Sequence, residues 1–336
     1  MTPAAQHRDH SFGVALTLVS AVTFGASGVL AKVAYAGGAG VVTLLTGRFL
    51  LAALLLWALV AWRRPALPPL RVAVAALLLG AVAYAGEASL YFSALERLDA
   101  SLVAMLLATY PVLVVAAAIA LGRERPDRRR AIALAVAIAG AALVLGGAQI
   151  GALSGPGLMF AGSATVAYAT YVLLADRFVA RVDGLLLAAL VTTGAGIGTL
   201  SFGAATRSLD SASLQTGGWL AIVLLAVVCT VVPISSFLLA LPRVGPGTAS
   251  ILSTFETVVG VGLAALLLGE SLGALQAAGA ALVVGAVVAL QIGQPSRIGG
   301  ADPRPARGPF TRVSLDDAAA VTAAPSAARA LAEQPA

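Results

Sequence analysis

The chain has 336 residues, of which 60% are hydrophobic and 11% are charged. Soluble domains carry about 25% charged residues, so this composition excludes a soluble globular protein and indicates a membrane protein. A single cysteine, Cys229, excludes an intrachain disulfide and a thiolate metal cluster, and the histidines His7 and His10 lie too close to the N-terminus to build a buried metal site. We therefore predict no metal, no cofactor and, because the net charge of +6 comes from loop and tail arginines, no nucleic-acid partner.

Apolar segments near the length of a transmembrane helix, about 20 residues, occur ten times along the chain. Glycine, proline and charged residues separate them. The predicted spans are residues 12–34, 41–62, 72–94, 100–121, 129–147, 157–177, 184–204, 217–241, 247–268 and 272–292.

Basic residues are distributed unevenly between the two sides of these spans. With the N-terminus inside, seventeen arginines fall in inner segments, and the outer loops hold only Arg97 and Arg207. Lys32 and Arg48 lie within or at the edge of spans. The positive-inside rule then predicts that both termini are cytoplasmic. We expect a multi-pass protein of the inner cell membrane, surrounded by the lipid bilayer.

The chain repeats itself. Shifting the sequence by 146 positions places Ala94-Leu95-x-Arg97 on Ala240-Leu241-x-Arg243, and apolar positions after them coincide. Five spans per half is an odd number, so the second copy enters the membrane from the opposite side, which is an inverted-topology repeat. The predicted fold is an all-α integral membrane protein of ten transmembrane helices, in two five-helix inverted repeats. Its segments are an N-terminal tail 1–10, repeats 11–147 and 157–292 joined by 148–156, and a disordered cytoplasmic tail 293–336.

Short motifs recur in both halves in the same order. The first half holds Phe24-Gly25, Gly47-Arg48-Phe49-Leu50-Leu51, Ala94-Leu95 with Asp99-Ala100-Ser101, Thr109-Tyr110-Pro111 and Leu121-Gly122-Arg123-Glu124, and the second holds Tyr168-Ala169, Phe255-Glu256-Thr257 and Leu268-Gly269-Glu270. Over residues 12–292 this pattern resembles the EamA branch of the drug/metabolite transporter superfamily. Phenylalanine and tyrosine replace the family's tryptophans, Arg123 interrupts the first Leu-Gly-Glu, and Thr257 replaces a proline.

The resemblance implies a secondary transporter that exports small metabolites such as amino acids by alternating access through a central cavity between the repeats. A multidrug exporter of the same superfamily is the alternative. An intramembrane enzyme, the hypothesis from another class, would need a nucleophile with a base or a metal cluster at membrane depth, which the spans do not supply. The substrate, the direction, the coupling ion and the oligomeric state stay open.

Charged side chains inside spans are costly and usually face a cavity or a partner. Arg48 and Glu87 each lie about eight residues, roughly 12 Å, from the outer end of their spans. They could form an ion pair lining the outer half of the cavity. In the functional interpretation, Arg48 binds a substrate carboxylate and Glu87 orients it, binds an amine or carries a proton. In the alternative interpretation, the pair only joins two helices.

Glu256 lies about nine residues into the ninth predicted span, close to the midplane. An isolated carboxylate at that depth is costly to keep charged, which makes Glu256 the first candidate for a proton-coupling residue. The alternative is a glutamate hydrogen-bonded to neighbouring hydroxyls such as those of Ser253, Thr254 or Thr257.

Aromatic side chains complete the predicted cavity. Phe24, Tyr84, Tyr110 and Tyr168 could pack against a planar substrate, although ordinary packing or interfacial placement is the more common role for any one of them. Glu124 and Glu270 stand at helix ends, where a capping or gating role is expected.

Overall fold

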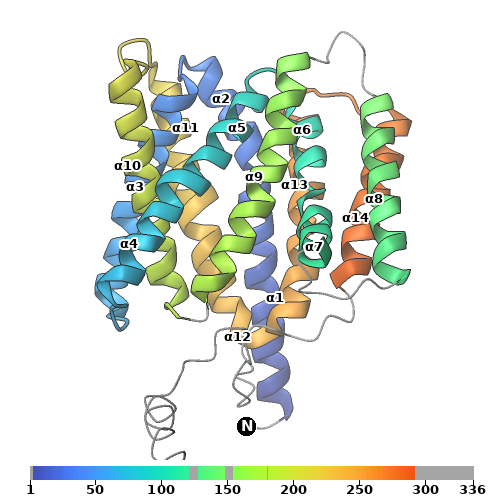
Figure 1. Cartoon of the computed structure of the whole chain (residues 1–336), viewed down its shortest axis with the longest axis horizontal. Helices are drawn as coiled ribbons and strands as arrows, with labels where there is room; N and C mark the ends of the chain where they lie inside the picture. The colour runs from blue at the N-terminus through green and yellow to red at the C-terminus, as the bar shows by residue number, and fades with distance from the viewer. Residues whose placement is uncertain (1–2, 121–127, 148–153, 180, 292–336) are drawn as a thin grey trace, which may run out of the picture. The chain divides into compact units, whose positions relative to one another are not determined.

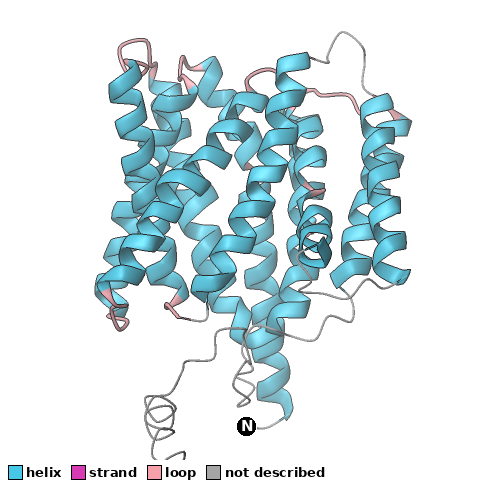
Figure 2. Ribbon diagram, in the orientation of Figure 1, coloured by secondary structure: helices cyan, strands magenta, loops and turns pink. Residues whose placement is uncertain are grey.

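The computed structural model describes residues 3–120, 128–147, 154–179 and 181–291, and the regular structure within these ranges is entirely helical (Figure 2). The elements of the first half are α1 (Pro3–Gly25), α2 (Ser27–Ala36), α3 (Val41–Arg63), α4 (Leu70–Leu78), the π-helix η1 (Leu79–Tyr84), α5 (Ala85–Leu95), α6 (Ala100–Leu107), α7 (Tyr110–Ala120) and α8 (Arg128–Gly146). Those of the second half are α9 (Gly155–Val179), α10 (Gly184–Thr206), α11 (Thr216–Ala226), the π-helix η3 (Val227–Val231), α12 (Val232–Ser253), α13 (Phe255–Leu268) and α14 (Ala274–Gln291).

Some of the predicted segments cannot be compared with the structure. Residues 148–153 of the predicted connection, the predicted tail 293–336 and Glu124 lie outside the described residues. At the other end of the chain, α1 begins at Pro3, so its helix starts before the predicted first span.

Each of the ten predicted spans coincides with helical structure. Eight stretches are long and apolar enough to cross a membrane: His10–Ala36, Val41–Arg63, Leu70–Leu95, Ala100–Ala117, Gly155–Phe178, Gly184–Thr206, Thr216–Gly245 and Ile251–Leu268. Two shorter apolar helices, Ala131–Gly146 and Ala274–Leu290, fall on the fifth and tenth predicted spans. The all-helical class is confirmed, and ten membrane crossings remain a prediction.

The outward faces of these helices are apolar, as a bilayer requires. Leu54 is 67% exposed, Val82 71% and Leu266 82%. Soluble monomers rarely expose large apolar side chains along several helices at once. Alanine, glycine and threonine occupy much of the buried interior instead, as expected where close helix packing rather than water exclusion drives association.

Glycines permit the closest helix crossings. A Cβ atom on Gly194 or Gly198 would collide with the backbone of Leu77 or Ala81, so α10 packs directly on α4 and η1. Gly140 and Gly279 bring α8 and α14 together in the same way, at the side of the bundle shown in Figure 1.

Several spans are interrupted, and the interruptions match between the halves. The helix that begins at Ala100 breaks at Ala108–Thr109, and its counterpart breaks at Thr254, which is 146 residues after Ala108. The π-helices η1 and η3 likewise interrupt corresponding helices of the two halves. Such breaks in membrane helices are tolerated where the freed backbone groups face a cavity or a polar neighbour.

Candidate functional site

A cavity of about 220 Å³ lies among helices of both halves. From the first half α1, α2, α5, α6 and α7 contribute to its wall, and from the second half α9, α12, α13 and α14. The lining residues that carry the argument are Phe24, Tyr91, Tyr110, Tyr168, Phe237 and Glu256.

The matched helix breaks open into this cavity. Pro111 has no N–H to donate to the Leu107 carbonyl, and the N–H of Val112 is donated to Thr109 rather than to Ala108. Leu107 and Ala108 therefore lose their usual helical donors, and both residues line the cavity. In the second half the N–H of Thr257 is donated to the Thr254 carbonyl, so the Ser253 carbonyl likewise lacks its usual helical donor. Ser253 also lines the cavity. The wall thus presents backbone acceptors from both halves.

Glu256 lies in the first turn of α13, directly after the second break. Within the described part of the chain its carboxylate has no hydrogen-bond donor or ion-pair partner. Two of the three predicted alternative partners are occupied elsewhere, because the hydroxyl of Ser253 donates to the Ala249 carbonyl and that of Thr254 donates to the Ile251 carbonyl. The unpaired N–H groups at a helix N-terminus favour a negative charge at this position. Glu256 thus faces the cavity without a partner.

Aromatic rings form much of the cavity wall. The rings of Tyr110 and Tyr168 lie edge to face, with centroids 4.5 Å apart and an interplanar angle of 70°. Tyr110 and Glu256 are 146 residues apart, so the repeat places them at equivalent positions of the two halves. Four of the seven residues proposed from the sequence, Phe24, Tyr110, Tyr168 and Glu256, line this cavity.

Arg48 is instead buried in a site of its own and does not line the cavity. Its Nε donates to Thr230 Oγ1 at 2.9 Å, and its Nη2 donates to the Cys229 carbonyl at 3.2 Å. That carbonyl lacks its usual helical donor, because the residue four positions later is Pro233. The guanidinium also lies over the Phe92 ring, 5.2 Å from its centroid. Arg48 therefore closes a gap in the backbone hydrogen bonding of η3 and α12.

The expected ion pair between Arg48 and Glu87 is wrong. Among the described residues one ion pair lies within 4.0 Å, and it joins Arg97 to Glu96. Glu87 is buried in α5 just after η1, and it is absent from the cavity wall. Counting residues from the span ends gives each side chain only a depth. It could not show that Thr230 and Cys229, from the other half, approach Arg48 more closely.

Tyr84 also lies away from the cavity. Its ring centroid is 5.2 Å from those of both Phe49 and Tyr171. Tyr171 is in turn stacked with Tyr168, at 6.2 Å. The aromatic residues therefore form a continuous packed file from the Arg48 region to the cavity wall, and Tyr84 belongs to the packed interior.

The opposite halves are joined at the end of the bundle where α5 leads into α6. Glu270 follows α13 and accepts hydrogen bonds from the backbone N–H groups of Ala100 and Ser101, at 2.7 and 2.9 Å, and from the Ser101 hydroxyl at 2.6 Å. It caps the N-terminus of α6, and the capping role expected for Glu270 is confirmed. Burial and the nearby Glu270 carboxylate raise the pKa of Asp99, the residue before this helix.

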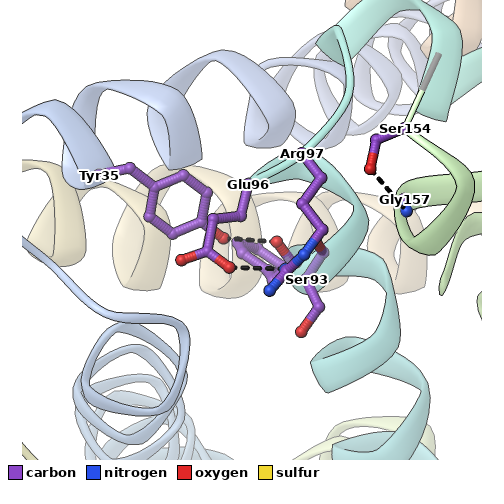
Figure 3. A network of polar contacts seen from close by, with 7 residues as sticks. Tyr35, Ser93, Glu96, Arg97, Ser154 and Gly157 are labelled. Carbon is purple, nitrogen blue, oxygen red and sulfur yellow. Dashed lines mark hydrogen bonds and ion pairs between the residues drawn. The ribbon is translucent and has the colours of Figure 1, made fainter.

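Further contacts hold the same end of the bundle together. Lys32 Nζ donates to the Leu98 carbonyl at 2.7 Å. Figure 3 shows Tyr35, whose hydroxyl donates to the Phe92 carbonyl, and Arg97, which bonds both Ser93 and Glu96. The Glu270 cap left a signal in the sequence, because Ala100-Ser101 and Leu268-Gly269-Glu270 both belong to recurring motifs. That one motif binds the other was missed.

Comparison with known proteins identifies the family. The model of the EamA-like transporter family matches residues 11–146 and again residues 155–291. The chain belongs to the EamA-like transporter family. The two consecutive matches fit the internal repeat of an EamA protein.

Two individual proteins are similar to this EamA chain. The uncharacterised transporter YcbK of Bacillus subtilis strain 168 is 27% identical over 284 residues, which cover 81% of this chain and 90% of YcbK. A crystal structure of another protein matches this chain with a TM-score of 0.58 and 19% identity, and the match covers 83% of this chain and 96% of the other. At that identity the likeness concerns the fold alone.

Proposed function

We propose that this chain is a secondary carrier that moves a small organic solute across the membrane by alternating access through the cavity between its two halves. The observation that carries the proposal is the cavity itself, which is lined from both halves at two matched helix breaks. Inverted repeats with discontinuous helices around a central site are the common design of secondary transporters.

The proposed topology has ten spans, as two five-helix inverted repeats at residues 11–147 and 157–292, with both termini on the cytoplasmic side of the inner membrane. The shorter helices α8 and α14 would supply the fifth and tenth crossings. In Figure 1 the C-terminal ends of α3 and α9, which carry Arg63 and Arg177 in their last turns, lie at the same end of the bundle as the start of α1. This arrangement agrees with a basic cytoplasmic side.

We propose export of small metabolites such as amino acids as the direction and first substrate class. The second candidate is export of drug-like compounds, which is favoured by the five aromatic residues in the cavity lining. Glu256 is the proposed proton-coupling residue, because it is the unpaired carboxylate that faces the cavity. Glu87 is the second candidate. It is buried in α5 and does not line the cavity, so its role in coupling would be indirect.

Counterflow in proteoliposomes tests the carrier function. Vesicles loaded with one unlabelled amino acid, sugar or cationic dye are diluted into the labelled compound, at equal and at unequal pH across the membrane. Transient accumulation of one class above that of protein-free vesicles is expected. Absence of movement for every compound, with the protein shown to be folded, would contradict the proposal. A Glu256→Gln variant that still concentrates solute under a pH gradient would remove the coupling role.

A further inference from the structure

We propose that the cavity selects organic cations, namely an ammonium group attached to a flat or apolar body, with Glu256 as the counter-ion. This inference rests on the proposed carrier function and adds the charge of the solute to it.

The first argument is the charge of the cavity wall. Among the described lining residues Glu256 is the single carboxylate, and no lysine, arginine or histidine accompanies it. The two basic side chains nearest in depth are engaged elsewhere: Arg48 binds Thr230 and Cys229, and Lys32 binds the Leu98 carbonyl. A solute whose charge is negative would find no counter-charge in the wall. A positive solute finds one at Glu256.

The second argument is the unsatisfied state of that carboxylate. Burying a charged group away from water without a partner is costly, and an opposite charge at contact distance removes much of the cost. The described residues provide Glu256 with no such partner, and the hydroxyls of Ser253 and Thr254 donate to carbonyls of α12. A bound ammonium group would supply both a hydrogen-bond donor and the missing charge.

The backbone adds acceptors of the same sign. The carbonyls of Leu107, Ala108 and Ser253 have lost their usual helical donors at the breaks, and all three residues line the cavity. Unwound carbonyls of this kind are the groups with which broken helices of transporters coordinate cations. Both halves therefore contribute oxygen acceptors, and the wall carries no charged donor to compete for them.

The third argument is the geometry of the aromatic side chains. Tyr110 and Tyr168 pack edge to face at 70°, so their rings lie in different planes of the cavity lining, and Tyr168 is also stacked with Tyr171. Phe24, Tyr91 and Phe237 add further rings to the lining. Ring faces attract cations, and several rings around one carboxylate are the arrangement that recognises substituted ammonium groups. The same rings accept the flat apolar body of the solute.

The test uses two permanently charged probes that share a phenyl ring, phenyltrimethylammonium and benzenesulfonate. Neither crosses a protein-free bilayer readily, so uptake of each labelled probe into proteoliposomes containing the full chain reports the carrier. The variants are Glu256→Gln, Glu256→Asp, which keeps the charge, and Tyr168→Leu. Glu96→Gln, an exposed glutamate outside the cavity wall, is the matched control.

We expect saturable uptake of the cation but not of the anion. Uptake should fall about tenfold or more in Glu256→Gln, as for other charge pairs removed from a desolvated site. It should fall less in Glu256→Asp and in Tyr168→Leu, and the control should match the wild type. Thermal unfolding of each variant establishes that it is folded.

Several results would overturn the inference. Uptake of benzenesulfonate at the same rate would refute the substrate class and leave the carrier function standing. Cation uptake that is unchanged in Glu256→Gln would refute the role of this residue. Uptake of neither probe would also refute the class, and the amino acids and sugars of the counterflow experiment then decide the proposed function separately, because movement of either identifies a carrier of another class.

Discussion

Two charged side chains in the interior of the bundle, Arg48 and Glu256, have opposite surroundings. Arg48 is 5% exposed. Its guanidinium donates to a hydroxyl and to a carbonyl left free by Pro233, and it lies over two aromatic rings. Glu256 faces a cavity, and the described residues leave its carboxylate unpaired. Both residues seemed equal in the sequence, since each places a charge at depth in an apolar span.

The difference shows that depth in the membrane does not by itself assign a role. A charged side chain that hydrogen-bonds to groups within the protein stabilises the fold, whereas a charged side chain without a partner beside a cavity is available to a ligand. Four variants test this contrast, in order of the expected effect on stability.

The largest effect is expected for Arg48→Gln. The change removes the two bonding donors, so the Cys229 carbonyl and the acceptor side of the Thr230 hydroxyl, which still donates to the Leu225 carbonyl, lose their donors. The free energy of unfolding should fall by about 3 kcal/mol. Denaturant titration of the purified protein in micelles measures it. Arg71→Gln, an exposed arginine, is the control. Normal stability combined with loss of solute binding would reverse the assignment of Arg48.

Glu270→Gln should have an intermediate effect. The amide keeps one acceptor oxygen but loses the charge and one of the two carboxylate oxygens that bond Ala100 and Ser101. A loss of about 1–2 kcal/mol is expected for such a cap. Hydrogen exchange at the N–H groups of Ala100 and Ser101 should accelerate, and Glu96→Gln should leave it unchanged. Equal protection in both variants would show that the cap contributes little.

Glu256→Gln should leave the stability unchanged or raise it, because a carboxylate without a partner is costly to bury. The variant breaks no hydrogen bond with a described residue and removes a charge that has no partner. Solute uptake should nevertheless be lost. A large fall in the unfolding midpoint would mean that Glu256 holds the fold together and that the contrast with Arg48 is false.

The smallest effect concerns a carboxylate in water. Hydrogen bonds from the Ser213 hydroxyl and from the N–H groups of Ala212 and Ser213 lower the pKa of Asp210 in the loop after α10. Its contribution to stability is therefore present at neutral pH and is lost as the pH falls through the folded-state pKa. Ser213→Ala should raise the pKa of Asp210 toward its ordinary value of 3.8. Carboxyl NMR titration measures the shift, and an unchanged value would contradict it.

The helices could be predicted from the sequence because long apolar runs bounded by glycine, proline and arginine form helices in a bilayer, where each backbone group must be hydrogen-bonded within the protein. The cavity could be predicted in part. Phe24, Tyr110, Tyr168 and Glu256 were found because they belong to the motifs that recur in the two halves. The partners of Arg48 could not be found, because Thr230 is 182 residues away and counting along a span gives depth but not the direction of a side chain.

The π-helices η1 and η3 set the rotational phase of the spans in which they lie. A π-helix holds an extra residue within its turn, and each residue of an α-helix turns the chain by about 100°. If the span became a regular α-helix without losing that extra residue, the part after η1 would turn by about 100° relative to the part before it. Glu87 would leave its buried position, and Tyr91 would leave the cavity wall. The spacing of this span is therefore as much a part of the site as the side chains that line it.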